Sequence, residues 1–146
     1  MISIRRALFP LTLLCSAGTA IAQGALPEEW PADWRLIGVA EDETQVLVRP
    51  ESIRELPPSD ARAFSVRQLW AGFGIPASGA GQPARKVVLF HYDCAGRRVL
   101  IAAATDYARD GRILARNAIE TDRADLYLPV DPETLNAAIM AQACPT

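Results

Sequence analysis

The sequence predicts an α+β domain: a six-stranded antiparallel β-sheet (meander), then one C-terminal α-helix packed on a sheet face and tied by a disulfide. Its 146 residues are enough for one domain. Six segments rich in β-branched and aromatic residues follow one another, and their links are too short for parallel crossovers. Beyond residue 130 the apolar period changes from that of a strand to that of a helix.

The first residues predict a cleaved signal peptide over 1–22. Arg5 and Arg6 are followed by a short apolar stretch, and Ala20-Ile21-Ala22 supplies the small residues that signal peptidase accepts. The alternative is a membrane anchor, but the apolar stretch is far shorter than the ~20 residues of a span. We therefore expect export to the periplasm or the cell surface, and a mature chain without a transmembrane span.

The mature chain is expected to begin at Gln23, with a leader of little structure over 23–33 and the domain over 34–146. Cys15 follows Leu14, where a lipidation signal needs a small residue, so we expect it to leave with the signal peptide. Cleavage also removes two of the 15 basic residues and none of the 17 acidic ones. A weakly acidic chain without a basic run is not expected to bind nucleic acid or anionic lipid.

The strands are expected at WRLIGVA (34–40), TQVLVR (44–49), RAFSVRQLWA (62–71), RKVVLFHYDC (85–94), RRVLIAAATDYA (97–108) and RILARNAIE (112–120). The acidic patch 41–43 suits a hairpin turn between the first two. Three prolines in 49–62 predict a loop, with one helical turn at 51–54. Residues 72–83, GFGIPASGAGQP, also predict a long loop. Asp110-Gly111 is a favoured hairpin dipeptide before the last strand.

The C-terminal segment predicts a helix that begins near residue 131. Asp131 can cap it and Pro132 suits its first position. Leu135, Ala138 and Ile139 then fall on one apolar stripe, which we expect to lie on the sheet.

Cys94 and Cys144 are expected to form a disulfide. Val88, Phe90, Tyr92 and Cys94 alternate onto one face of a strand, and Cys144 follows the helix that needs such a face. Exported proteins normally pair their cysteines, and a loop of about 50 residues would add on the order of 4 kcal/mol. The alternative is two free thiols.

No residue pattern predicts a catalytic, cofactor-binding or metal site. His91, the only histidine, would lie on the opposite strand face from Cys94, which makes a Cys–His pair unfavourable. Asp106, beside Tyr107, is interpreted as structural. The other carboxylates lie mostly in expected turns: Glu41, Asp42, Glu43, Asp60, Asp110, Asp122 and Asp125.

Aromatic and glycine-rich segments are the alternative binding features. Trp30, Trp34 and Trp70 could form a stacking or sugar-binding platform, although packing is the commoner role, and Trp30 is expected to be the most exposed. The loop 72–83 is expected to be a mobile hairpin tip rather than a phosphate loop, because no helix pattern follows it.

The fifth strand is apolar on both faces, and one helix covers only one of them. The two alternating sets are Leu100, Ala102, Ala104 and Val99, Ile101, Ala103. Either the loop 51–62 or a second copy of the chain in a homodimer could cover the other face.

The chain resembles the surface-adhesin protein E family of Gram-negative bacteria. The motifs that carry the resemblance are Trp34, VRPESI at 48–53, VRQLW at 66–70, HYDC at 91–94, TDYARDGRIL at 105–114 and LYLPVDPETL before Cys144. The resemblance implies a six-stranded sheet with a C-terminal helix held across it by a disulfide. It also implies an adhesin-like protein that can dimerise and bind host matrix proteins.

We therefore expect an exported, non-enzymatic binding or adhesion module of the envelope, whose partner is a host matrix protein or an envelope component. The alternatives are a periplasmic structural or inhibitor-like protein that binds a bacterial envelope partner, and a small hydrolase that uses two carboxylates.

Overall fold

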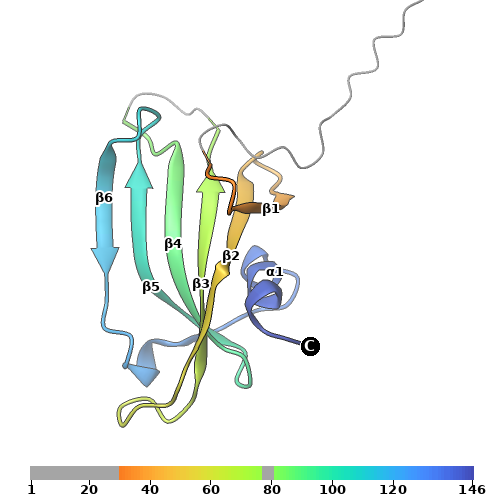
Figure 1. The fold of residues 1–146 in the computed structure, drawn as a ribbon, viewed down its shortest axis with the longest axis vertical. Helices are drawn as coiled ribbons and strands as arrows, with labels where there is room; N and C mark the ends of the chain where they lie inside the picture. The colour runs from red at the N-terminus through yellow and green to blue at the C-terminus, as the bar shows by residue number, and fades with distance from the viewer. Residues whose placement is uncertain (1–29, 77–80) are drawn as a thin grey trace, which may run out of the picture.

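The structure is a computed structural model that describes residues 30–76 and 81–146. The expected signal peptide, most of the expected leader and the tip of the loop 72–83 lie outside the described residues. The strands are β1 (Arg35–Val39), β2 (Gln45–Leu56), β3 (Val66–Gly74), β4 (Arg85–Asp93), β5 (Arg98–Tyr107) and β6 (Ile113–Ala118). They pair antiparallel in chain order, which confirms the predicted meander (Figure 1).

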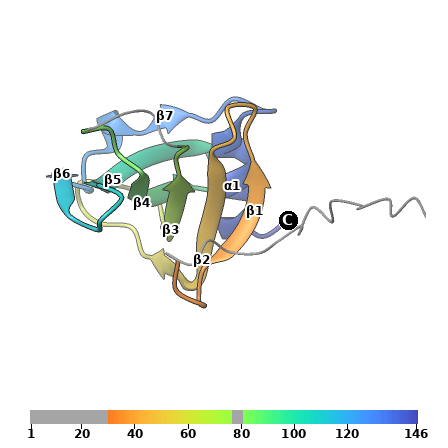
Figure 2. The ribbon, with the colours of Figure 1, turned by 90° about the horizontal axis from the view of Figure 1, so that it is seen from above.

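After β6 the chain returns along the sheet to the C-terminal helix. It forms a short 3₁₀ helix, η1 (Ala124–Leu126), and a two-residue strand, β7 (Leu128–Pro129), which pairs with the start of β5. Helix α1 (Leu135–Ala143) follows and packs against β2 and β3. Seen from above, β6 lies at one edge of the curved sheet, and α1 lies beside β1 and β2 (Figure 2).

The predicted loop with a helical turn at 51–54 is wrong, because β2 continues through this segment to Leu56. The pairing of β2 with β3 shifts register between Arg49 and Arg54. Pro50 lies inside this shift, so its missing N–H removes no regular ladder hydrogen bond. The prolines of the true loop come only after Leu56.

Strand β3 also runs further than expected. Phe73 pairs with Lys86 and Gly74 with Arg85, so the first residues of the predicted loop 72–83 belong to the ladder. Glycine is a weak strand former, but Gly72 is required here because the Trp30 ring lies where a side chain would be.

Helix α1 begins later than predicted, because Thr134 rather than Asp131 is its N-cap. The Thr134 hydroxyl accepts from Ala137 N (3.2 Å) and donates to the Asp131 carbonyl (2.7 Å). This shift changes the buried stripe as well. Ile139 is buried as expected, whereas Leu135 and Ala138 are exposed, and the other buried positions are Met140 and Ala143.

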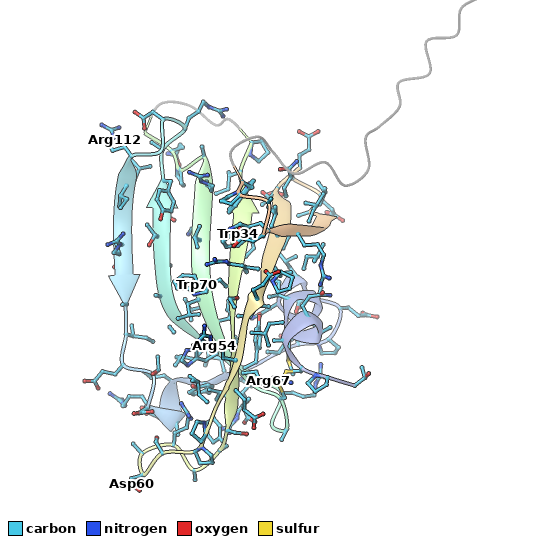
Figure 3. The ribbon with its side chains drawn as sticks, in the orientation of Figure 1. Trp34, Arg54, Asp60, Arg67, Trp70 and Arg112 are labelled. Carbon is cyan, nitrogen blue, oxygen red and sulfur yellow. A yellow bond between two sulfur atoms is a disulfide. The ribbon has the colours of Figure 1, made fainter. Side chains whose placement is uncertain are left out.

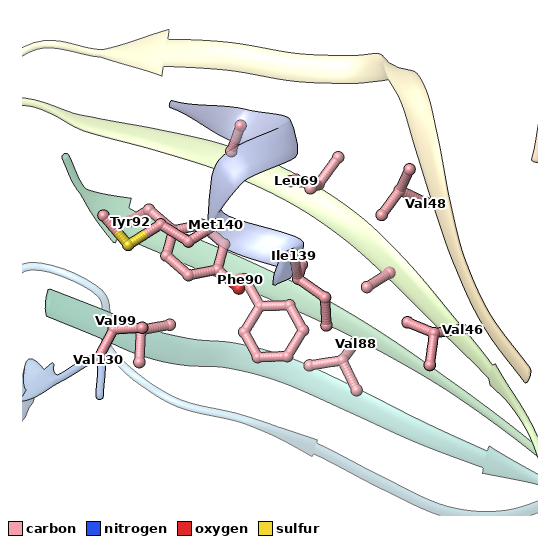
Figure 4. Packing of buried hydrophobic residues seen from close by; sticks show 12 residues of the cluster. Val46, Val48, Leu69, Val88, Phe90, Tyr92, Val99, Val130, Ile139 and Met140 are labelled. Atoms are coloured by element: carbon pink, nitrogen blue, oxygen red, sulfur yellow. The ribbon is translucent and has the colours of Figure 1, made fainter. Parts of the chain in front are cut away.

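The main core lies between α1 and the sheet face that it covers. Ile139 and Met140 pack over valines and aromatic residues from β2 to β5 (Figure 4). Tyr92 anchors the helix, because its hydroxyl donates to Asn136 Oδ1 (2.7 Å). Arg35 of β1 donates to Gln142 near the other end of α1 (2.8 Å).

The predicted disulfide is present. Cys94 follows β4, Cys144 caps α1, and their Cα atoms are 5.6 Å apart. Among the described residues, no helix combines the length and apolar character needed to span a bilayer.

Candidate functional site

The sheet face away from α1, called the second face here, carries the candidate site. Cross-strand pairing aligns its side chains in rows from β2 to β6. One row contains Arg49, Trp70, Leu89, Ala103 and Ala118, and the next contains Leu47, Gly72, Val87, Thr105 and Arg116. Large and small side chains therefore stand next to one another on a single surface.

A bulge in β5 decides which residues share this face. Leu89 pairs with Ala103 and Phe90 with Ile101, so Ala102 is left between them without a β4 partner. The two alternating sets predicted for β5 are wrong beyond this point, because the bulge reverses the alternation. Leu100 lies on the second face with Ala103, and Val99 lies on the helix face with Ala104.

Two tryptophans cover the second face at its β1 end. Trp30 and Trp34 pack with Leu47 in a small cluster, and their ring centroids are 5.0 Å apart. The expectation of an exposed Trp30 is wrong: its side chain is only 6% exposed. Gly72 makes room for the ring, and the Arg85 guanidinium lies 5.3 Å from its centroid.

A second cluster covers the opposite end of this face. Phe64 and Tyr127 meet edge to face at 5.1 Å over Val66 and Leu100. The buried Arg62 lies beside them and donates to the carbonyls of Pro57 and Phe64. The chain itself thus covers both ends of the second face. The loop predicted as a cover contributes only through its last residues, since 51–56 is strand.

His91 lies under this second cluster. It faces away from α1 as expected and is only 3% exposed, and its Nδ1 has no hydrogen-bond partner. Burial lowers the pKa of His91, and the nearby positive charge of Arg62 lowers it further, while Asp122 opposes the shift. A buried neutral imidazole next to a guanidinium fits a structural role.

Between the covered ends lies a groove of about 360 Å³, called the aromatic groove here. Its floor is Val87, Ala103 and Thr105 with Ala118 at the edge, and Trp34, Trp70 and Tyr107 rise beside it. The groove forms because the side chains in a row become smaller from Trp70 on β3 to Ala103 on β5. Trp34 and Trp70 follow one another down the sheet, with Arg54 below them (Figure 3).

Positive charge borders the aromatic groove. Arg49 and Arg116 line it with Asn117, and none of the described residues that line it is a carboxylate. Arg49 forms an ion pair with Asp33, whereas Arg116 makes no ion pair within the part of the chain that the structure describes. The groove therefore offers aromatic faces and a free guanidinium to an anionic partner.

The remaining candidate residues do not form a site. Asp106 pairs with Lys86 at 3.4 Å, in agreement with a structural role. Asp125 binds Arg123, and Asp122 binds Ser59 and approaches Arg62. Across residues 30–76 and 81–146, no group of three histidine, cysteine or carboxylate residues could hold a metal ion.

The sequence interpretation missed most of the groove. Trp34 and Trp70 were candidates as a platform, but Tyr107, Arg49 and Arg116 were not. In the sequence, these residues show only that they alternate with residues of the other sheet face along their own strands. They form one site only because the register of five strands brings them side by side. Buried Asp93 was also missed; it binds Arg98 (2.6 Å) and the Gly96 N–H and closes the β4–β5 hairpin.

Residues 30–76 and 81–146 thus form a disulfide-bonded β-meander with one α-helix, and an aromatic groove lies on the sheet face away from that helix. Comparison of the chain with protein-family models, with curated proteins and with solved structures finds no match.

Proposed function

We propose that this protein is an exported, non-enzymatic binding module of the cell envelope, similar to the surface-adhesin protein E family. The observation that carries the proposal is the aromatic groove. Tryptophan, tyrosine and arginine are the residues that dominate the energetics of protein–protein interfaces. Here two tryptophans, one tyrosine and two arginines surround one hollow on the second face of the sheet.

The disulfide supports an oxidising location, since such bonds persist outside the cytosol. It fits a periplasmic protein and a surface-exposed one equally well. Labelling of intact and permeabilised cells with an antibody against the folded domain separates the two. Signal on intact cells supports adhesion, and signal only after permeabilisation supports a periplasmic partner.

The binding role is tested by filling the groove. Ala118 is exposed at its edge, so Ala118→Trp should occupy the hollow without disturbing the core. Ala115→Trp is the matched control, because Ala115 is an exposed alanine of the same strand that pairs with Asp106 on the opposite face. Immobilised protein is incubated with envelope extract and with purified host matrix proteins.

We expect the wild type and Ala115→Trp to retain the same partner, and Ala118→Trp to lose it at an unchanged melting temperature. Equal retention by all three proteins would remove the groove from the proposal. No specific retention from either source would remove the binding role.

A further inference from the structure

We propose that the aromatic groove and the free edge of β6 together bind an extended acidic segment of a partner protein. In that segment a carboxylate and an apolar side chain stand two residues apart. This inference rests on the proposed binding function and adds the chemistry of the partner.

The first support is an unpaired strand edge next to the groove. Strand β6 pairs with β5 on one side, and no other strand in the described part of the chain pairs with its outer side. Isoleucines 46% and 47% exposed, Ile113 and Ile119, stand at its two ends. An open edge with exposed apolar residues is a template for an added strand.

The second support is the direction of the β6 backbone. Ile119 N donates inward to the Ala102 carbonyl (3.0 Å). Backbone groups alternate sides along an antiparallel strand, so the N–H and C=O groups of Ala118 and Arg116 point to the free edge. The side chains of these two residues line the groove. A strand added at this edge would therefore bind the backbone of Arg116 and Ala118, and its side chains would lie next to the side chains of the same two residues.

The third support is charge. Among the described residues, Arg116 forms no ion pair and no carboxylate lines the groove, in a chain whose net charge is −2. A carboxylate opposite Arg116 would gain a charge-assisted hydrogen bond. An apolar side chain two residues further along would lie on the same face, next to Ala118 and over the hollow at Ala103. A second copy of the chain fits less well, because self-pairing of β6 would bring two Arg116 side chains into one short ladder.

The test uses two fluorescein-labelled peptides of identical composition and measures fluorescence anisotropy. Thr-Glu-Thr-Phe-Thr-Glu-Thr places its glutamates and phenylalanine on one strand face, whereas Thr-Thr-Glu-Phe-Glu-Thr-Thr places them on opposite faces. A third peptide replaces the glutamates of the first with glutamine. We expect the first peptide to bind at least tenfold tighter than the other two, and to weaken as salt is raised.

Arg116→Glu should weaken the first peptide at least tenfold. Arg97→Glu makes the same charge change on an exposed residue of the β4–β5 turn and should have no effect. Equal binding of the two isomers would overturn the strand geometry. If Arg97→Glu lowered the peptide affinity as much as Arg116→Glu, the effect would come from net charge alone. That result would overturn the proposed binding site.

Other occupants give other results. Tight binding of oligogalacturonate with no binding of the peptides would assign the groove to an acidic carbohydrate and overturn this inference. A mass of two chains in light scattering that falls to one in Arg116→Glu would assign the edge to a second copy, and would overturn it as well. In either case, loss of the captured partner in Ala118→Trp would still support the proposed binding function.

Discussion

His91 and Gly72 show how single residues fix the two covered ends of the second face. His91 is buried beside Arg62 at the end that Phe64 and Tyr127 cover. Gly72 leaves room for the Trp30 ring at the other end. At Gly72 the Trp30 ring leaves no space for a side chain. At His91 the surrounding residues leave Nδ1 without a hydrogen-bond partner.

The folded protein should lose stability as the pH falls below 6.5. The pKa of His91 is lowered from 6.5 in the folded state, so the unfolded chain binds the proton more readily. The contribution is complete above 6.5 and decreases as the pH falls from 6.5 toward the lower folded pKa. Urea unfolding at pH 7.5 and pH 5 should show this decrease in the wild type and less of it in His91→Gln.

The shift can be measured directly, because tag-free protein has one histidine and gives one imidazole C2-proton signal in NMR. A titration midpoint at or above 6.5 would contradict the predicted pH dependence.

Gly72→Ala should destabilise the protein by about 1–3 kcal/mol, since the added methyl group overlaps the Trp30 ring and comes within 3.0 Å of Trp34. Gly38→Ala is the control, because nothing lies within 4 Å of a methyl group there. Chemical denaturation measures both, and tryptophan emission should shift to the red only in Gly72→Ala. Equal stability of the two variants would place Trp30 elsewhere.

Among the secondary-structure elements, β2 and α1 are each held by one local interaction. In β2 it lies where the regular pairing with β3 is interrupted, and in α1 it lies where the helix ends. Ser52 bridges the irregular part of β2, donating to the Arg49 carbonyl (2.6 Å) and accepting from Trp70 N (2.9 Å). It replaces the ladder where β2 and β3 lose register, and it fixes the backbone of a groove residue. At the end of α1, the disulfide joins the C-cap residue Cys144 to Cys94 after β4 and so holds the helix against the sheet.

Ser52→Ala should cost about 1–2 kcal/mol, because it leaves the Trp70 N–H without its partner in a site that is 8% exposed. Ser65→Ala, an exposed serine before β3, should change stability by less than about 0.5 kcal/mol. Thermal or urea unfolding compares the two. A Ser52→Ala variant as stable as Ser65→Ala would mean that water replaces the hydroxyl.

Cys144→Ser should lower the free energy of unfolding by about 4 kcal/mol, since the bridge joins residues 50 apart in the sequence. Cys94→Ser and the double variant should lose the same amount, because each removes the same bond. Thiol labelling of the denatured, unreduced mature protein should find no free cysteine. Two labelled thiols in the wild type would refute the bridge.

At the scale of the whole molecule, the chain covers most of its own second face. Trp30 and Trp34 shield one end and Phe64 and Tyr127 shield the other, and within residues 30–76 and 81–146 the aromatic groove between them stays open. A fully uncovered apolar face would favour a homodimer. The part of this face that stays open is much smaller than a stable dimer interface usually needs.

We therefore expect light scattering at micromolar concentration to give the mass of one chain. A mass of two chains that persists on dilution would show that another surface carries a homodimer, as the family resemblance implies. The Ala118→Trp variant then tells whether that surface includes the groove.

Residue patterns along the chain predict the meander, its hairpins, the terminal helix and the disulfide, all of which the structure contains. These features depend on local patterns: alternation in residues 85–94, the Asp110-Gly111 turn, and the two cysteines Cys94 and Cys144 at the ends of a strand and a helix. Local patterns are visible in sequence because neighbouring residues create them.

The tertiary structure decided what local patterns could not. The three prolines of 49–62 predict a loop, but pairing of residues 54–56 with β3 extends the strand to Leu56. Asp131 and Thr134 are both good caps, and packing of Ile139 and Met140 selects Thr134. The bulge at Ala102 then sets which side chains meet Trp70 and Arg116. The groove depends on register across five strands, and register is a property of the assembled sheet, because each strand's neighbours come from distant parts of the chain.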